Sequence, residues 1–298
     1  MEEPFKNTVL ITGIGGFTGA HLEAKMKKMG YRVFGTTNST ALKQNHFQCN
    51  ILNKESLFEV VSIVKPNFII HLAAISFVAS KDVTAIYNTN ILGTLNLLEC
   101  LDELKLDIKK IILASSAAIY GNVEGVLSES LCPKPVNHYG NSKLVMENMV
   151  ASYFNKFEII IARPFNYTGI GQNNSFLIPK IVKHFREKKS TIKLGNLHTF
   201  REYNNVSSFS DIYIKLLNST FHSDKVNICS GSTYSIGEIL SMLERITGHS
   251  LKVEVNPMFV RKNEIVELKG STNKLFSVLR QSIKFKTLEE TLIEMITQ

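Results

Sequence analysis

Long apolar runs, paired cysteines and a basic, apolar leader are all missing from this sequence of 298 residues, and each absence excludes a class of protein. No apolar stretch reaches the roughly 20 residues that a membrane-spanning helix requires. The four cysteines, Cys49, Cys100, Cys132 and Cys229, stand far apart, which argues against a disulfide framework and against a zinc site. The first six residues lack the basic start and apolar stretch of a signal peptide. We therefore expect a cytoplasmic protein that neither spans a membrane nor holds a metal ion.

Acidic residues are fewer than basic ones, 26 against 34, so the formal net charge is +8. Such a balance suggests an anionic partner. The basic residues are scattered, however, in short doublets such as Lys27-Lys28 and Lys188-Lys189, within stretches that have a helical pattern. This distribution favours a solvated surface over a nucleic-acid interface, and an anionic small molecule would use the charge equally well. We expect no nucleic-acid partner.

Short β-branched runs alternate with amphipathic stretches through the first half of the chain. We expect strands at residues 8–12, 31–36, 47–50, 67–71, 108–115 and 157–162, and helices at 16–29, 53–64, 83–104 and 141–155. The strands are continuous apolar runs, as in a parallel sheet that helices cover on both faces. The alternation predicts an α/β fold with a Rossmann-type, doubly wound parallel sheet.

The regular alternation of strand and helix patterns ends after Pro164. A loop rich in glycine and asparagine begins there, and the later expected strands are shorter. We expect a first domain of residues 1–165, to which the chain returns at about 206–228. A smaller, mixed α/β lobe would then comprise residues 166–205 and 229–298.

A glycine-rich turn, Gly13-Ile14-Gly15-Gly16-Phe17-Thr18-Gly19, follows the first expected strand and opens the first expected helix. Glycines at this place permit a tight turn and allow backbone N–H groups to approach a pyrophosphate, and the helix N-terminus adds partial positive charge. A purely structural turn is the alternative, but the position directly after the first strand favours dinucleotide binding.

The end of the second strand bears on the choice of dinucleotide. NAD-binding chains usually carry an acid there, which bonds the ribose hydroxyls. This chain has Thr37, Asn38 and Ser39 instead, which could donate to a 2′-phosphate, with Lys43 within reach and no arginine. We therefore expect NADP(H), with NAD(H) as the alternative.

Tyr139 and Lys143 are spaced to lie on one face of a helix. A nearby cation lowers the pKa of a phenol toward the working range of an acid–base catalyst. Tyr-x-x-x-Lys also occurs by chance on surface helices, but Ser116 precedes this pair at the end of an expected strand. There its hydroxyl could bond a reacting carbonyl, or, as the alternative, cap the next helix.

These motifs resemble the extended short-chain dehydrogenase/reductase family, which comprises nucleotide-sugar epimerases, dehydratases and reductases. The resemblance covers residues from about 7 to 291 and rests on segments 12–19, 71–74, 90–99, 115–121 and 139–143. In the second half, segments 163–172, 194–197 with Arg201, 227–231 and 256–264 are similar to the GDP-6-deoxy-mannose reductases and their GDP-mannose dehydratase relatives.

The resemblance implies a role for each matched residue. Tyr139 would be the acid–base group, Lys143 its helper and Ser116 the hydroxyl that positions the substrate. Asn90 would order a water or the lysine, although a buried asparagine that bonds the backbone is an equal alternative. The expected cofactor contacts are Gly13, Gly15, Gly16, Phe17, Thr18, Gly19, Thr37, Asn38, Ser39, Asn50, Ile51, Leu72, Ala73, Ala74, Asn90, Ser115, Tyr139, Lys143, Pro164 and Phe165. The expected substrate contacts are Ser76, Ser116, Asn166, Lys180, Arg201, Arg261 and Glu264, of which the arginines would bind the diphosphate.

The chain departs from the family's pattern at three places. The family's dehydratases need an acid directly before the apolar-Tyr-Gly step, and this chain has Ala117-Ala118 there. Three acids common after the motif arginine are replaced by Glu202, Asn205 and Ser208, which puts the local ion pairs in doubt. His138 stands where proline is common and is expected to lie in a loop.

Dehydration is therefore disfavoured, and two enzyme readings stay open. A reductase would transfer hydride from NADPH to the C4 ketone of a nucleotide-linked 4-keto-6-deoxyhexose, in the synthesis of surface-polysaccharide precursors such as lipopolysaccharide O-antigen. An epimerase would use bound NAD to oxidise C4 and reduce its other face. A regulator that senses NADP without chemistry is the non-enzyme alternative. Retention of both Tyr139 and Lys143 argues against it, and we favour the reductase, acting as a homodimer.

Overall fold

The computed structural model describes residues 7–40, 43–76, 82–256, 265–281 and 283–298. The chain divides into two compact units. Unit 1 comprises residues 1–121, 132–164 and 210–226, and unit 2 comprises residues 122–131, 165–209 and 227–298. Residues 122–131 thus belong to unit 2 rather than to the first domain of the sequence prediction, because strand β6 (Val126–Leu127) pairs there with β15 (Glu267–Gly270).

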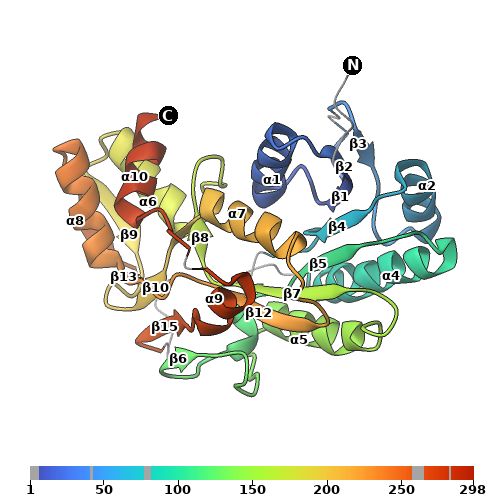
Figure 1. Cartoon of the computed structure of the whole chain (residues 1–298). Coiled ribbons are helices and arrows are strands. Elements are labelled where there is room, and N and C mark those ends of the chain that lie inside the picture. The colour runs from blue at the N-terminus through green and yellow to red at the C-terminus, as the bar shows by residue number, and fades with distance from the viewer. Residues whose placement is uncertain (1–6, 41–42, 77–81, 257–264, 282) are drawn as a thin grey trace. The chain divides into compact units, whose positions relative to one another are not determined.

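Unit 1 is built on a seven-stranded sheet in the order β12-β7-β5-β4-β1-β2-β3 (Figure 1). The strands are β1 (Thr8–Thr12), β2 (Arg32–Thr37), β3 (His46–Gln48), β4 (Phe68–His71), β5 (Lys110–Ala114), β7 (Ile159–Pro164) and β12 (Asp224–Ile228). The pairs from β3 across to β7 are parallel, so their carboxyl ends share one edge of the sheet. The order reverses between β1 and β4, the kind of switch point at which Rossmann folds bind ligands. The predicted fold class is confirmed.

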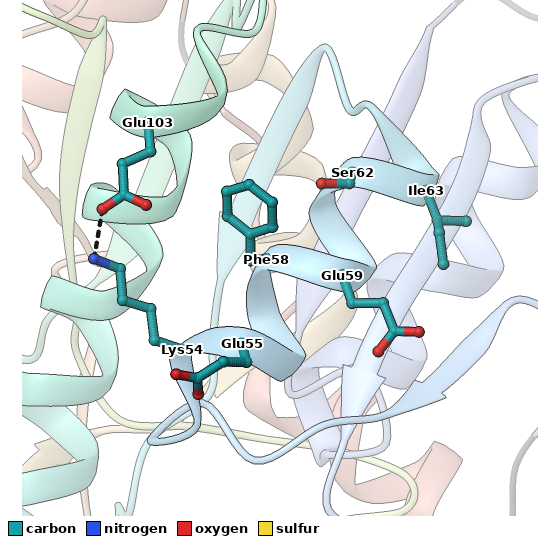
Figure 2. Close-up of a pocket in the computed structure, with 7 residues that line it drawn as sticks. All are labelled: Lys54, Glu55, Phe58, Glu59, Ser62, Ile63 and Glu103. Atoms are coloured by element: carbon teal, nitrogen blue, oxygen red, sulfur yellow. Dashed lines mark hydrogen bonds and ion pairs between the residues drawn. The ribbon is translucent and has the colours of Figure 1, made fainter.

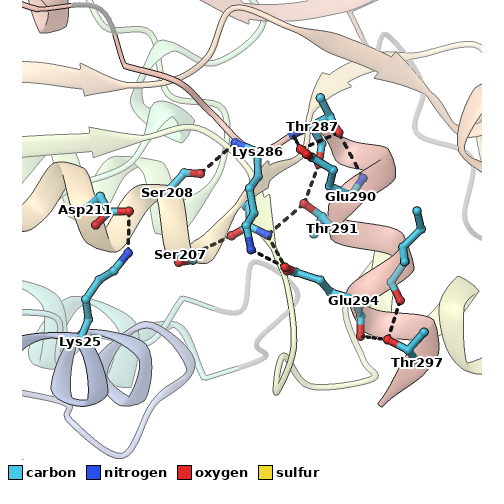
Figure 3. A network of polar contacts seen from close by, with 12 residues as sticks. Lys25, Ser207, Ser208, Asp211, Lys286, Thr287, Glu290, Thr291, Glu294 and Thr297 are labelled. Carbon is cyan, nitrogen blue, oxygen red and sulfur yellow. Dashed lines mark hydrogen bonds and ion pairs between the residues drawn. The ribbon is translucent and has the colours of Figure 1, made fainter. Parts of the chain in front are cut away.

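Helices cover this sheet because their apolar faces match its buried strands. The helices of unit 1 are α1 (Phe17–Lys28), α2 (Lys54–Val64), α3 (Val83–Tyr87), α4 (Gly93–Leu104), α5 (His138–Ala151) and the larger part of α7 (Val206–Leu217). Leu57 of α2, Leu97 of α4 and Met146 of α5 join one core cluster with Leu10 and Ile111 of the strands. An ion pair of 2.5 Å between Lys25 and Asp211 ties α1 to α7 (Figure 3).

Two helices differ from their expected bounds. The long helix expected at residues 83–104 contains a π-helical turn, η1 (Asn88–Leu92), between α3 and α4. Such turns are frequent at functional sites. Helix α5 begins at His138 rather than at 141, because the side chain of Asn137 accepts a hydrogen bond from the backbone N–H of Gly140 at 2.8 Å. His138 is therefore a helical residue, and its expected place in a loop is wrong.

Unit 2 contains a four-stranded sheet in the order β13-β10-β15-β6 and two strand pairs, β11-β8 and β14-β9. Its strands besides β6 and β15 are β8 (Tyr167–Thr168), β9 (Thr191–Leu194), β10 (Phe200–Glu202), β11 (Asn204–Asn205), β13 (Thr233–Ser235) and β14 (Lys252–Val255). Its helices are α6 (Leu177–Arg186), α8 (Ile236–Thr247), α9 (Asn273–Leu279) and α10 (Leu288–Thr297). Ile181, Phe185, Ile239, Leu243 and Leu292 form the centre of its core.

In unit 2, the side chains of Glu202 and Asn205, which stand where the family commonly has aspartates, have defined hydrogen-bond partners. Glu202 is buried and accepts hydrogen bonds from the backbone N–H groups of Ser230, Gly231 and Gly270. The Asn205 amide donates to Thr291 on α10 at 3.0 Å, beside the ion pair of Lys286 and Glu294 that Figure 3 shows. Glu202 therefore keeps a carboxylate that backbone N–H groups satisfy, whereas Asn205 supplies a neutral donor to α10.

Candidate active site

The carboxyl end of β5 leads directly into the predicted catalytic serine. Ser116 follows the strand, and its Oγ accepts a hydrogen bond from the backbone N–H of Ala118 at 3.1 Å. It thereby caps the short 3-10 helix η2 (Ala117–Tyr120). Ser116 therefore caps a helix, as the alternative interpretation of the sequence expected. The capping bond occupies only a lone pair of Oγ, so the O–H group can still donate a hydrogen bond.

A close contact holds η2 against the start of α5. A Cβ atom added to Gly140 would lie 2.6 Å from the carbonyl oxygen of Ala118 and 3.0 Å from Pro135. A residue with a side chain would push the two elements apart, so glycine is required here. The contact brings the residues that follow Ser116 against the turn that carries Tyr139.

Lys143 lies one turn beyond Tyr139 and is 3 % exposed. Its Nζ donates a hydrogen bond of 2.7 Å to the carbonyl oxygen of Ala114, the last residue of β5. Burial lowers the pKa of Lys143 to about 8, and the negative charge of Glu147 opposes this fall. The structure thus brings Lys143 to the end of the strand that Ser116 follows, and places Tyr139 in the first turn of the same helix.

A buried polar network that the sequence analysis did not anticipate lies behind these residues. The Glu147 carboxylate accepts from Ser115 Oγ at 2.5 Å and from Arg163 at 2.9 and 2.6 Å. Arg163 also donates to the hydroxyl of Tyr120 at 2.9 Å. The sequence held one indication of this network: Glu147 stands four residues after Lys143, a spacing that places both side chains on the same face of the helix.

Asn90 in the π-helical turn is fully buried. Its Oδ1 accepts from the backbone N–H of Ile75, and its Nδ2 donates to the carbonyl of Ile75 and to Ser142 Oγ, at 2.8, 3.2 and 2.9 Å. Ser142 stands between Tyr139 and Lys143 on α5. Of the two readings that the sequence left open, the structure shows the buried asparagine that bonds the backbone, and its side chain ties residue 75 to α5.

His71, at the end of β4, joins a second buried network. Its ring nitrogens lie 2.7 Å from Thr12 Oγ1 and 2.9 Å from Thr94 Oγ1. Burial lowers the pKa of His71 to about 3, and the positive charge of Lys143 adds to the fall. The ring is therefore neutral at physiological pH and links β1, β4 and α4.

The glycine turn has the geometry that a dinucleotide requires. Gly13 has φ +71°, and a Cβ there would lie 2.9 Å from the backbone nitrogen of Ala73. The turn leads into α1 at Gly16, the N-cap residue, which has no side chain to occupy the N-terminus of the helix. Backbone donors, a helix N-terminus and no acid in its first turn fit a bound pyrophosphate.

The other residues expected at the cofactor follow the carboxyl ends of neighbouring strands. Thr37 ends β2, and its Oγ1 accepts from the backbone N–H of Ser39 at 3.2 Å, while Asn38 and Ser39 are exposed. Residues 72–74 follow β4, and Ser115 follows β5. Asn50 and Ile51 follow β3, and Pro164 ends β7. The sheet thus brings all of these residues to one edge, together with the glycine turn and Ser116.

The residues expected at the substrate in unit 2 have partners of another kind. Lys180 on α6 donates to the carbonyl of Lys193 at 2.9 Å. Arg201 on β10 donates to the carbonyls of Phe200, Ile265 and Val266 at 2.8, 3.1 and 3.4 Å. Asn166 is exposed. Phe165, which was expected at the cofactor, belongs to unit 2, where its side chain is 1 % exposed and packs at Gly270. Ser76 of unit 1 is exposed, and Arg261 and Glu264 lie outside the described residues.

A surface hollow of about 720 Å³ lies elsewhere on unit 1, on α2 and α4 (Figure 2). Its lining residues are Lys54, Glu55, Phe58, Glu59, Ser62, Ile63 and Glu103. Lys54 spans it with an ion pair of 2.6 Å to Glu103. None of the expected catalytic or cofactor residues lines this hollow, and its exposed ion pair gives no reason to place chemistry there.

In the described part of the chain, no helix is long and apolar enough to cross a membrane, and no three His, Cys, Asp or Glu side chains are grouped to hold a metal ion. All four cysteines are free thiols. Burial raises the pKa of the Cys49, Cys100 and Cys229 thiols.

Comparisons with known proteins agree on one family. Residues 10–295 match the family model described as GDP-mannose 4,6 dehydratase. The chain is 37% identical, over 96% of both proteins, to GDP-6-deoxy-D-talose 4-dehydrogenase of Aggregatibacter actinomycetemcomitans. It is 29% identical to GDP-6-deoxy-D-mannose reductase of Pseudomonas aeruginosa, over 90% of this chain and 89% of the relative.

A solved structure gives the same answer for the fold. The structure of RMD from Pseudomonas aeruginosa complexed with NADPH superposes with a TM-score of 0.88 at 26% identity, over 98% of both chains. Together with the sequence relatives and the geometry at the end of β5, this likeness identifies the chain as a member of the GDP-mannose 4,6-dehydratase family, which is a family of oxidoreductases and epimerases acting on nucleotide sugars.

Proposed function

We propose that this chain is an NADPH-dependent reductase of the C4 ketone of a GDP-linked 4-keto-6-deoxyhexose. The observation that carries the proposal is the buried Lys143, which is bonded to the end of β5 one turn from Tyr139 and next to Ser115-Ser116. This is an arrangement for protonating an oxygen. The absence of a carboxylate at Ala117 and Ala118 argues against dehydration.

Bound NADPH would supply the hydride that reaches C4 from one face of the sugar. The glycine turn and the N-terminus of α1 would hold its pyrophosphate, and Thr37, Asn38 and Ser39 would bond the 2′-phosphate. NAD is the alternative, and the acid-free end of β2 favours NADP. The NADPH of the Pseudomonas aeruginosa structure supports the same choice.

In the reduction, Ser116 donates a hydrogen bond to the ketone oxygen and holds it beside the phenol of Tyr139. Tyr139 transfers its proton to that oxygen as the hydride bonds to C4, so the product is an alcohol and a phenolate remains. The ammonium of Lys143 stabilises the phenolate until water returns the proton. In the opposite direction the same groups remove the proton from the C4 hydroxyl.

Two of the relatives support a GDP sugar as the substrate. Both named sugar relatives act on a GDP-6-deoxyhexose, and talose and mannose differ only in the configuration at C4. The greater identity to the talose enzyme favours GDP-6-deoxy-D-talose as the product. In unit 2, Asn166, Lys180 and Arg201 are the residues of the described chain that we propose for the diphosphate. We further propose a cytoplasmic homodimer that makes precursors of surface polysaccharide.

The test is consumption of NADPH against 4-keto-6-deoxy sugars carried on GDP, dTDP, CDP and UDP, with NMR of the product to assign C4. We expect turnover with the GDP sugar and the talo configuration. A product with the manno configuration would support the proposed reductase but would change the proposed product from GDP-6-deoxy-D-talose to GDP-6-deoxy-D-mannose. If no sugar is reduced and NAD copurifies with the protein, the epimerase takes the place of the reductase.

A further inference from the structure

Glu147 carries a buried charge that none of the steps above uses. It lies one helical turn beyond Lys143 and two turns beyond Tyr139, on the face of α5 turned to the sheet, and is 5 % exposed. A carboxylate is costly to bury unless partners satisfy both of its oxygens. The position of those partners shows what the charge is placed to do.

Both oxygens of Glu147 are bonded to the carboxyl ends of two strands. Oε1 accepts from Ser115 Oγ at 2.5 Å and from Arg163 Nε at 2.9 Å, and Oε2 accepts from the Nη2 of Arg163 at 2.6 Å. The arginine contact is bidentate, which fixes orientation as well as distance. Arg163 in turn donates to Tyr120 at the end of η2. One carboxylate therefore joins α5 to β5, to β7 and, through Arg163, to η2.

Two consecutive residues at the end of β5 are thus attached to two consecutive turns of α5. The carbonyl of Ala114 holds Nζ of Lys143 at 2.7 Å, and the hydroxyl of Ser115 holds Glu147 at 2.5 Å. A single attachment would let the helix pivot on the strand. Two attachments one turn apart fix its rotation as well, and with it the place of Tyr139 relative to Ser116.

The charge of Glu147 also acts on Lys143. Two titratable groups interact with the charge of the ammonium: Glu147 on its own helix, and His71 at the end of β4. His71 is neutral, because burial and the charge of Lys143 lower its pKa to about 3. Glu147 works against the burial that lowers the pKa of Lys143 to about 8. Loss of the carboxylate would leave Arg163 as an uncompensated cation in the same core.

We propose that Glu147 is a positioning residue, which, through Ser115 and Arg163, sets the distance and orientation of Tyr139 and Lys143 relative to Ser116. The inference rests on the proposed function, because it assigns how the groups of that reaction are held. It predicts a loss in kcat without an equal loss in binding, since Glu147 is buried and both of its oxygens are bonded to protein side chains.

Two variants separate geometry from charge. Ser115→Ala removes one hydrogen bond and no charge. Glu147→Gln removes the charge and replaces the oxygen that accepts from Arg163 Nη2 with an NH2 group, which cannot accept. We expect kcat to fall about tenfold in Ser115→Ala and about a hundredfold in Glu147→Gln. KM for the sugar should change less than about threefold in both variants, and KM for NADPH less than about threefold in Glu147→Gln. The loss of activity at alkaline pH should move to lower pH in Glu147→Gln alone.

Glu23→Gln is the matched control. Glu23 is also a carboxylate of unit 1 that is 5 % exposed, and it is paired with Lys27 on α1 and with His46 on β3, not with any residue of the catalytic network. We expect this variant to lose stability and to keep the wild-type kcat per folded site. If Glu147→Gln behaves in the same way, with lower stability and an unchanged kcat and pH profile, the positioning role is wrong.

A readout without substrate distinguishes this outcome from failure of the proposed function. NMR of isotope-labelled lysine at Cε, assigned with Lys143→Met, gives the titration midpoint of Lys143. We expect Glu147→Gln to lower that midpoint by about one pH unit and Glu23→Gln to leave it in place. If the wild type reduces no sugar but the midpoint moves, the proposed function fails, whereas the part of this inference that couples Glu147 to Lys143 is supported.

The converse outcome is equally distinct. If the wild type reduces a sugar while Glu147→Gln changes neither kcat nor the midpoint, this inference is overturned and the proposed function stands. Should Glu147→Gln not fold, Glu147→Asp replaces it, because the shorter side chain keeps the charge but cannot reach Ser115 and Arg163 together. Its kcat should then fall with little change in the midpoint of Lys143, and a wild-type kcat would overturn the proposal.

Discussion

The candidate residues of the two units are held in different ways. At the end of β5 in unit 1, Lys143 and the network of Ser115, Glu147 and Arg163 are buried. There Glu147 and Arg163 bond each other, and Lys143 bonds the carbonyl of Ala114. In unit 2, Arg201 and Lys180 are half-buried, and they donate hydrogen bonds to backbone carbonyls. Burial fixes the geometry of unit 1 before the substrate arrives, which a chemical step requires. The half-buried cations of unit 2 remain within reach of solvent and can bond the oxygens of an anion, which suits a binding step.

The largest effect should come from the phenol itself. Tyr139→Phe removes the proton donor and leaves the ring in place, so we expect kcat to fall by about two to four orders of magnitude. Binding of NADPH, measured by fluorescence, should stay near the wild-type value. Tyr153→Phe, in the turn that follows α5, is the control and should keep its turnover. Equal losses in both variants would remove Tyr139 from the mechanism and with it the contrast between the units.

A smaller loss should follow when η2 is pushed from α5. Gly140→Ala would place a Cβ 2.6 Å from the carbonyl oxygen of Ala118, so the two elements must separate. We expect a fall in kcat of about tenfold to a hundredfold and a lower midpoint of thermal unfolding. Gly237→Ala on α8 of unit 2 is the matched control, because a Cβ there would lie 3.8 Å from Ser235 Oγ, an ordinary contact distance. That change should raise stability slightly, since alanine favours a helix by about 1 kcal/mol.

The positions of Tyr139, Lys143 and Ser116 could be predicted because their signals are local. Spacing along a helix and a place after an apolar run are both written in neighbouring residues. The pairing of Glu147 with Ser115 and Arg163 could not, because the three residues come from different elements that only the folded sheet brings together. The start of α5 was missed for a related reason: the cap supplied by Asn137 outweighs the weak helix propensity of Gly140 and Asn141.

The backbone carbonyls that accept from Arg201 and Lys180 could not be predicted from the sequence, because every residue has a carbonyl and nothing in the sequence marks the ones that are used. The strands and helices of unit 1 were close to their expected bounds, since each is a continuous apolar run or a regular amphipathic stretch. The π-helical turn at residues 88–92 was not expected. It accompanies the bonds of Asn90 to Ile75 and Ser142, which are tertiary contacts.

Removing a cation of unit 2 should change binding more than chemistry. For Arg201→Ala we expect KM for the GDP sugar to rise about tenfold, as for the loss of a hydrogen bond to a charged group, with kcat nearly unchanged. Arg245→Ala, whose guanidinium makes an exposed ion pair of 2.8 Å with Glu289 on α10, is the control in the same unit. A fall in kcat as large as that expected for Gly140→Ala would show that Arg201 serves the chemical step and would break the comparison.

The smallest effect concerns stability rather than turnover, and it tests how deeply the core of unit 1 excludes charge. His71 has a pKa of about 3 in the folded chain against an ordinary value of 6.5, so between these values the unfolded chain binds the extra proton. Stability should therefore be complete above about pH 6.5 and fall as the pH is lowered toward 3, by at most about 1.4 kcal/mol per pH unit from this group. His71→Asn removes this dependence, so its free energy of unfolding in urea should fall less steeply with acid than that of the wild type. His222→Asn, which alters a half-exposed ring, should keep the wild-type slope. An equal slope in wild type and His71→Asn would mean that the ring accepts a proton within the folded core. The buried network around His71 would then tolerate a positive charge, as the half-buried surroundings of Arg201 and Lys180 in unit 2 do.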